Sequence, residues 1–356
     1  MSGSSLSGRP EPDDVASIHH VDELEEIARR RLPAATYGYV AGGAGRETTI
    51  AANRESLDQL RLVPRVMRDV AQVSTATTLL GDETALPLVV APSAVQRLAH
   101  PDGELATARA ARAAGLTMVL SMNASTTVEE VTATGVRCWM QLYFSRDREH
   151  MRGVVRRAEA AGVSALCVTV DHAGMPTRLR ELDRPLEIPS DVRFVHLSDD
   201  PARRGVDRTL TWEVVGWLRD VTDLQIVLKG VLHPDDAALA ATHGVDGIIV
   251  SNHGGRQLDG TVATYEVLPA VLRAVDGRCE VFADGGIRSG PDLIKALALG
   301  ARAGLIGRPV WWGLAAAGEA GVARVIQLIA DDFTETMRLC GSADVGSIGP
   351  DLLWRP

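Results

Sequence analysis

The sequence predicts an α/β fold, a (β/α)8 TIM barrel with an N-terminal helical cap, from three observations. Short apolar runs alternate with helix-like segments, the runs number eight, and polar residues follow nearly every run. Apolar strands joined by helices form parallel sheets buried on both faces, and eight such units close into a barrel. A doubly wound sheet uses similar units, but the eight repeats and the polar rim favour the barrel. The runs are residues 86–91, 117–120, 138–142, 165–170, 226–229, 247–250, 280–283 and 303–306.

Helices are expected between these runs and before the first of them. Residues 21–31 place Leu24, Ile27 and Ala28 on one helical face, and Pro33 ends this helix before a glycine-rich stretch, 38–45, that is predicted to be a flexible loop. Residues 1–14 lack apolar periodicity and are predicted to be a disordered tail, which leaves 15–356 as one domain. A helix is expected after each run, for instance at 103–114, 147–161, 212–221, 234–241 and 291–299.

Composition excludes several classes of protein. Of the 356 residues 46% are hydrophobic, enough for a large aliphatic core, and a net charge of −9 argues against a nucleic-acid groove. The four cysteines are far apart, and Cys138 and Cys167 fall in strand-like runs. They are predicted to be buried thiols in a reducing cytoplasm, without disulfide or metal site. No leader sequence and no run of ~18 apolar residues is apparent, so neither secretion nor a membrane span is expected.

Lysine is rare in this chain. Of the 37 basic residues only Lys229 and Lys295 are lysines. A compact ammonium group can change its protonation state or direct one charge at a ligand atom, which a guanidinium does less well. Lys229 ends a predicted strand and is the candidate functional lysine, whereas Lys295 is expected to be an exposed helix residue.

The segment 180–209 interrupts the alternation, because it is irregular and lies between the fourth predicted strand and its helix. Long loops at that end of a barrel are usually lids or site walls, and a tolerated insertion is the alternative. Because chemistry in such barrels lies where the strands end, the polar residues there are candidate site residues. They are Ser93, Ser121, Gln141, Tyr143, Thr169, Asp171, Lys229, Ser251, His253, Arg256, Asp284, Arg288, Gly307 and Arg308.

Two motifs after the last two strands are typical of phosphate binding. In DGGIRSG (284–290) and IGRP (306–309), glycines let backbone N–H groups approach an anion, and Arg288 and Arg308 supply charge-assisted contacts. Glycine turns with surface arginines are the alternative. The phosphate could belong to a sugar, a nucleotide or FMN.

SNHGGRQLDG (251–260) suggests a catalytic histidine. His253 follows an aliphatic strand, the two glycines after it allow close approach to a ligand, and Arg256 is near enough to pair with a substrate anion. Asp171 could hydrogen-bond the imidazole, with a loop cap as its alternative role. Tyr39 and Tyr143 could donate phenolic hydrogen bonds into the same pocket.

The chain resembles the FMN-dependent 2-hydroxy-acid oxidases and dehydrogenases, a family that includes glycolate oxidase, lactate oxidase and mandelate dehydrogenase. The resemblance covers residues 21–347. It rests on motifs that occur in the family order: YGYVAGGAG (37–45), APSAVQRLAHPDGE (91–104), QLY (141–143), TVD (169–171), LKG (228–230), SNHGGRQLDG, DGGIRSG and IGRP.

The resemblance implies an FMN site and a substrate site. Lys229 would face the N1/C2 edge of the flavin ring and stabilise the anionic reduced form. The ribityl and phosphate groups would be held by residues from Asp284 onward. The implied FMN-binding residues are Pro92, Ser93, Ala94, Ser121, Gln141, Thr169, Lys229, Ser251, Asp284, Gly285, Gly286, Arg288, Gly307 and Arg308.

For catalysis, the resemblance implies that Arg178 and Arg256 grip the substrate carboxylate with help from Tyr39, and that Tyr143 touches the substrate hydroxyl or carboxylate. His253 would remove a proton, and Asp171 would stabilise the imidazolium that results. The proton comes either from Cα or from the hydroxyl with hydride transfer. Arg178 is chosen for its spacing after Asp171, and Arg180 is the fallback.

The chain departs from the family in two places. Its lid is shorter than in the plant-type oxidases and lacks the apolar insertion of membrane-bound mandelate dehydrogenases. Met122 and Asn123 replace the Ser-Trp of glycolate oxidase, which opens the presumed substrate wall to a larger or aryl acid such as mandelate or hydroxymandelate.

Three other functions compete with oxidation of an (S)-2-hydroxy acid. Lys229 could form a Schiff base in an aldolase, the same FMN site could act on a different substrate, or the chain could be an idle flavin-binding scaffold. The electron acceptor could be oxygen, a quinone or a protein. Relatives are commonly tetramers, so a homo-oligomer is expected.

Overall fold

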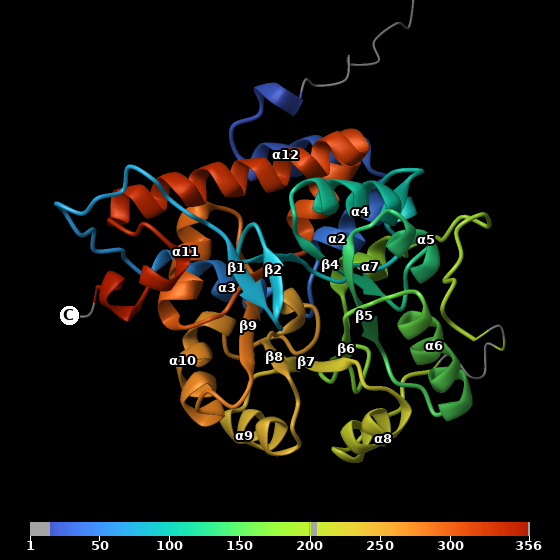
Figure 1. The fold of residues 1–356 in the computed structure, drawn as a ribbon. Helices are drawn as coiled ribbons and strands as arrows, with labels where there is room; N and C mark the ends of the chain where they lie inside the picture. Colours follow the sequence, from blue (N-terminus) through green and yellow to red (C-terminus); the bar gives the residue numbers. More distant parts are fainter. Residues whose placement is uncertain (1–14, 199, 201–204, 355–356) are drawn as a thin grey trace, which may run out of the picture.

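A computed structural model describes residues 15–198, 200 and 205–354 of the chain. The predicted N-terminal tail, 1–14, lies outside these residues. The described part forms a closed parallel barrel in which each strand pairs with the next along the chain and the last pairs with the first (Figure 1). This confirms the predicted (β/α)8 barrel. Its strands are β3 (Leu88–Val90), β4 (Thr117–Ser121), β5 (Arg137–Leu142), β6 (Ala165–Thr169), β7 (Gln225–Val231), β8 (Gly247–Val250), β9 (Glu280–Asp284) and β10 (Gly304–Ile306).

The barrel interior is a packed core. Inward-facing aliphatic side chains surround Trp139 and Phe282, whose rings meet edge-on with centroids 5.6 Å apart. An antiparallel hairpin of β1 (Thr77–Leu79) and β2 (Asp82–Thr84) contributes the buried Leu79 to this core. The interior therefore leaves ligand binding to the ends of the strands.

The outer helices bury a second, larger core against the barrel. A helix follows each barrel strand, as expected, and the five helices whose bounds were expected are all present. The set is α4 (Gly103–Ala113), α5 (Val128–Ala133), α6 (Arg148–Ala160), α8 (Glu213–Val221), α9 (Pro234–Thr242), α10 (Thr264–Val275), α11 (Gly290–Leu299) and α12 (Arg308–Cys340).

Helix α12 crosses the top of the barrel in Figure 1 and packs against α1 (Val21–Arg31), α4 and α11. In the described part of the chain it is the one helix long and apolar enough to span a membrane, and half of its apolar window is buried inside the protein. Its backbone leaves helical geometry at Ala317 and Gly318. Burial against three helices is typical of a core helix in a globular protein.

The N-terminal cap consists of α1 (Val21–Arg31), α2 (Ala34–Ala41) and α3 (Thr48–Asp58). Leu24, Ile27 and Ala28 are buried on one face of α1, as predicted. The prediction of a flexible loop over 38–45 is wrong for its first half, because residues 38–41 belong to α2. A glycine inside a helix costs only about 1 kcal/mol, which burial of neighbouring Thr36 and Val40 can offset.

The segment after β6 begins with a short helix, α7 (Leu179–Asp183), and its described part remains irregular up to α8. Two of its contacts reach other site elements: Gly45 forms a bridge with Arg178, and Ser145 forms one with Val206. The segment thus lies against both the cap and the third barrel strand, as expected of a site wall.

Candidate active site

A cavity of about 380 Å³ lies at the carboxyl ends of the barrel strands, beneath the cap. All predicted site residues line it except Asp171, Gln141 and Ser251. Each of these three hydrogen-bonds a residue that does: Asp171 contacts His253, Gln141 contacts Ser121 and Thr169, and Ser251 contacts Lys229. The structure therefore brings the whole predicted set together.

His253 is held in an uncommon backbone conformation. Its φ of 59° is left-handed, and its N–H donates to Ser251 Oγ at 3.0 Å. For a residue with a Cβ, this left-handed conformation costs about 1–2 kcal/mol relative to the right-handed one. The turn continues through Gly254 and Gly255, which also have positive φ. It directs the imidazole across the strand ends towards Asp171.

Asp171 orients the imidazole. Its two carboxylate oxygens lie 3.0 and 3.2 Å from His253 Nδ1, so Nδ1 carries the proton that the carboxylate accepts. Burial raises the pKa of Asp171, but the charge and hydrogen bond of His253 outweigh it and leave the pKa lowered. Gly230 makes room for this carboxylate, since a Cβ there would lie 2.5 Å from Asp171 Cγ. The other ring nitrogen, Nε2, is the atom that can accept a proton from a ligand.

Tyr143 lies next to that nitrogen. Its hydroxyl is 3.4 Å from His253 Nε2. Burial, and then the nearby Asp171 charge, raise the pKa of Tyr143 far above its ordinary value. The phenol is therefore neutral at physiological pH and can donate a hydrogen bond to an anionic ligand.

Arg178 and Arg256 form the cationic wall of the cavity. Arg256 donates to the carbonyl oxygens of Tyr39 and Gly42, and its guanidinium lies 4.8 Å from the centre of the Tyr39 ring. Arg178 is 11% exposed, and its buried Nε has no partner among the described residues. Two buried guanidinium groups with an unused donor form a site for a carboxylate.

Glu181 accompanies these arginines and was not predicted. Its Oε1 lies 3.2 Å from Arg178 and 3.9 Å from Arg256. Arg178 lines the cavity, whereas Arg180, the fallback, is absent from its lining and pairs with Glu47 at 2.6 Å. Glu181 follows both arginines in TRLRELD (177–183), and this closeness in sequence was the one signal that could have indicated its role.

Lys229 is buried beside a second carboxylate. Its Nζ lies 2.8 Å from Asp284 Oδ2 and donates to Ser251 Oγ at 2.9 Å. Burial lowers its pKa, but the charges of Asp284 and Asp171 outweigh this effect and raise it. The amine is therefore protonated at neutral pH, whereas a Schiff-base nucleophile must be neutral. Lys295, expected to be exposed, is half-buried and donates to the Leu57 carbonyl.

A row of neutral polar groups continues along the strand ends. Gln141 Nε2 donates to Thr169 Oγ1 at 2.9 Å, and Gln141 Oε1 accepts from Ser121 Oγ and from the Met122 N–H. These bonds link the side chains at the ends of β4, β5 and β6 to one another. Pro92, Ser93 and Ala94 line the cavity directly after β3.

The far end of the cavity is suited to an anion. Gly285 and Gly286 have φ of 93° and 102°, and a Cβ at Gly286 would approach the Asn53 carbonyl to 3.1 Å. Arg308 donates to the carbonyls of Val40, Gly254 and Gly42 and forms no ion pair among the described residues. Burial, and then repulsion from Arg256 and Arg288, lower its pKa to about 9. A bound anion would relieve this repulsion.

Comparison with known proteins agrees with this geometry. The model of the FMN-dependent dehydrogenase family matches residues 28–355. The chain belongs to the FMN-dependent dehydrogenase family. It is 45% identical to 4-hydroxymandelate oxidase of Amycolatopsis orientalis over 91% of this chain and 95% of that one. It is 41% identical to human 2-hydroxyacid oxidase 1 over 94% and 95% of the two chains.

Solved structures give the same result. A crystal structure of mandelate oxidase has a TM-score of 0.89 and 45% identity, covering 95% of this chain and 98% of that one. A mandelate oxidase mutant with (S)-mandelic acid has a TM-score of 0.90 at 44% identity and the same coverage.

The cavity of this FMN-dependent dehydrogenase fits its cofactor. Arg308 and the backbone of Gly285, Gly286 and Gly307 would hold the phosphate. Asp284 Oδ1, which is buried without a partner among the described residues, would accept from a ribityl hydroxyl. Lys229, Thr169 and Ser121 would face the flavin ring. Arg288 lines the cavity too, but it already pairs with Asp22 at 2.6 Å and Glu25 at 2.7 Å.

An amide pair that supports the FMN-dependent dehydrogenase site was not predicted. Asn53 Nδ2 donates to Asn252 Oδ1 at 2.8 Å, and Asn252 Nδ2 donates to Asn53 Oδ1 at 2.7 Å. Both residues are buried, and the pair joins α3 to the turn that carries His253. His172, which follows TVD directly, also lines the cavity and was missed.

Proposed function

We propose that this protein oxidises an (S)-2-hydroxy acid to the 2-oxo acid and passes the electrons to oxygen. The observation that carries the proposal is the placement of His253, oriented by Asp171, in the same cavity as Arg178 and Arg256. A proton acceptor facing a carboxylate site suits a substrate whose acidic group and reacting carbon are neighbours.

The chain's own residues divide the work. Arg178 and Arg256 bind the substrate carboxylate, and Tyr143 donates a hydrogen bond from its neutral phenol. His253 Nε2 takes one proton from the substrate, and Asp171 stabilises the resulting imidazolium. Bound FMN supplies the acceptor for the two electrons that the substrate carbon loses.

We further propose that the substrate is an aryl acid. Asn123 and Met175 line the cavity on the substrate side, and no tryptophan stands at position 122 or 123. The relatives named mandelate and hydroxymandelate oxidase support the same choice. Mandelate or a hydroxylated mandelate is therefore the proposed substrate type.

The proposal extends to acceptor, assembly and location. Oxygen is the proposed acceptor, with a quinone or protein partner as the alternative. Four free cysteines support a reducing cytoplasm. The proposed assembly is a homotetramer, and exposed Val66 and Met67 are adjacent large apolar side chains of the kind that interfaces between chains bury.

Anaerobic bleaching of the flavin tests the function. Purified protein is mixed with aliphatic and aryl (S)-2-hydroxy acids, and oxygen is then admitted. We expect mandelate-type acids to bleach the yellow absorbance and oxygen to restore it with formation of hydrogen peroxide. Absence of bleaching by every acid would contradict the proposal, and bleaching without fast reoxidation would point to another acceptor.

A further inference from the structure

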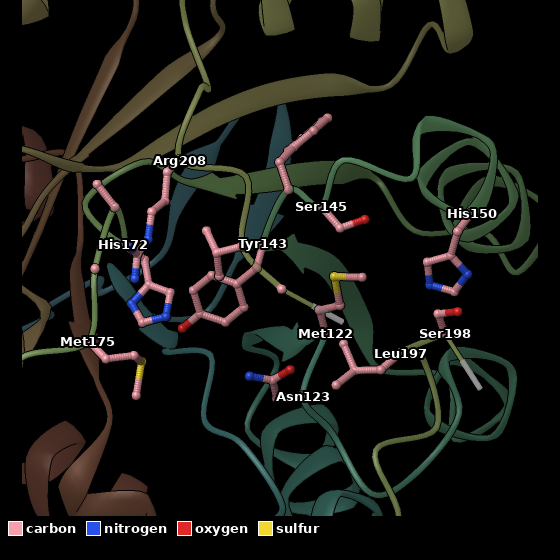
Figure 2. A pocket seen from close by; sticks show the side chains of 15 residues that line it. Met122, Asn123, Tyr143, Ser145, His150, His172, Met175, Leu197, Ser198 and Arg208 are labelled. Carbon is pink, nitrogen blue, oxygen red and sulfur yellow. The ribbon is translucent and has the colours of Figure 1, made fainter. Parts of the chain in front are cut away.

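A second chamber, of about 440 Å³, adjoins the substrate side of the active-site cavity. Asn123, Tyr143, His172 and Met175 line both spaces and so form the boundary between them. Figure 2 shows these four side chains together, with Arg208 drawn next to His172, and Leu197 and His150 on the other side of Tyr143. A substrate bound at His253 could therefore extend past Tyr143 into this chamber.

The chamber wall is apolar with a cationic pole. Met122, Phe144 and Leu197 supply its apolar surface. Its described lining contains Arg208 and two histidines but neither aspartate nor glutamate. A ligand with an apolar middle and an anionic end would match both parts of this wall.

Arg208 is available for such a ligand. It forms no ion pair or side-chain hydrogen bond within the described part of the chain. The adjacent carboxylate, Asp207, instead forms ion pairs with Arg148 at 2.9 Å and Arg146 at 3.6 Å. Asp171 is likewise committed to His253. The exposed Arg208 guanidinium therefore has no carboxylate partner among the described residues and can contact a ligand at the chamber wall.

His172 stands at the boundary between the two spaces. Its ring centroid lies 5.0 Å from that of Tyr143 and 6.3 Å from that of His253. The Gln257 side chain hydrogen-bonds its Nδ1 and holds the ring in place. This position beside the reacting end makes the chamber a continuation of the active site.

We propose that the chamber binds the far end of an elongated 2-hydroxy acid that carries a second anionic group, with Arg208 as its partner. The proposal rests on the proposed function and narrows its substrate class to acids with a distal negative charge. Apolar surface around Met122 and Leu197 contacts the middle of such a substrate.

Matched substrate pairs test the proposal. The kcat/KM for 4-carboxymandelate is compared with that for mandelate, and 2-hydroxyadipate is compared with 2-hydroxyhexanoate, in the FMN-loaded enzyme. We expect the acid with a distal carboxylate to be preferred about tenfold in at least one pair, the effect of one charge-assisted hydrogen bond. Arg208→Gln should remove this preference and leave kcat/KM for mandelate unchanged.

Arg193→Gln is the matched control, because Arg193 is exposed on the same segment and lies outside both linings. It should keep the preference. Binding of the 2-oxo product of each dicarboxylate, followed by the change in flavin absorbance, gives the same comparison without turnover. Equal kcat/KM and equal binding within both pairs, or a preference that survives in Arg208→Gln, would overturn the proposal. Oxidation of mandelate in that case would leave the proposed function intact, whereas failure of every 2-hydroxy acid would refute both.

Discussion

His253 Nδ1 lies 3.0 Å from one carboxylate oxygen of Asp171 and 3.2 Å from the other. Asp171→Asn should therefore slow flavin reduction by about 10²- to 10⁴-fold while FMN stays bound, because a neutral amide cannot stabilise the imidazolium. Stopped-flow absorbance measures the rate. Asp351→Asn, which removes an exposed carboxylate paired with Arg65, is the control and should reduce normally. An unchanged rate in Asp171→Asn would show that the carboxylate only closes a loop.

Arg178 and Arg180 differ by two positions but face different surroundings. Arg178→Gln should lower kcat/KM about 10- to 100-fold, mainly through KM, because a charged hydrogen bond to the substrate carboxylate is lost. Arg180→Gln should change kcat/KM little, since that side chain is 46% exposed and pairs with Glu47. Steady-state kinetics with mandelate makes the comparison. Equal losses would mean that the carboxylate site is misplaced.

Arg308 and Arg288 both line the proposed phosphate site, but among the described residues only Arg288 has carboxylate partners. Arg308→Met should raise the Kd of FMN at least about tenfold, and Arg288→Met should raise it less. Fluorescence titration of the flavin-free protein gives both values. Riboflavin, which lacks the phosphate, should bind similarly to both variants and the original protein. A larger effect of Arg288→Met would reverse the assignment.

Asp259 ties the histidine-bearing motif to the start of α3. It accepts from the N–H groups of Arg46 and Thr49 and from the Thr48 hydroxyl at 2.8 to 3.0 Å. Burial raises its pKa, but these hydrogen bonds outweigh it and lower the pKa to about 2. A lowered folded-state pKa stabilises the protein above the ordinary value of about 3.9, and this stabilisation is lost as the pH falls towards the folded value.

Asp259→Asn should consequently destabilise the protein at neutral pH and much less near pH 2. Urea midpoints measured at several values from about pH 6 to about pH 2 should converge for the two proteins. Asp276→Asn, at an exposed helix end, is the control, and its urea midpoint should change with pH in the same way as that of the original protein. A constant difference between Asp259→Asn and the original protein would contradict the shifted pKa.

Sequence reasoning predicted the barrel because its signal is repeated. Each strand is a short aliphatic run. Because both faces of such a strand are buried, its residues do not alternate between apolar and polar, as those of a half-exposed strand do. The loop expected at 38–45 failed because glycine content was taken as flexibility. Contacts of Gly42 with Arg256 and Arg308 hold this region in place, and they join residues more than 200 positions apart.

The candidate site was predictable where residues follow strand ends, as with Asp171 and His253. Glu181 and Asn53 were not predictable in the same way, since their roles depend on elements that pack from outside the barrel. The ion pairs of Arg288 with Asp22 and Glu25 could not be predicted either, because α1 lies at the opposite end of the sequence.

The role of His253 as the base in oxidation of a 2-hydroxy acid is tested by anaerobic flavin reduction with (S)-mandelate. The measurement compares the original protein with His253→Gln, with FMN content checked in both. We expect both proteins to bind FMN and only the original protein to be bleached within seconds. Bleaching of His253→Gln at the original rate would contradict the assignment of His253 as the base.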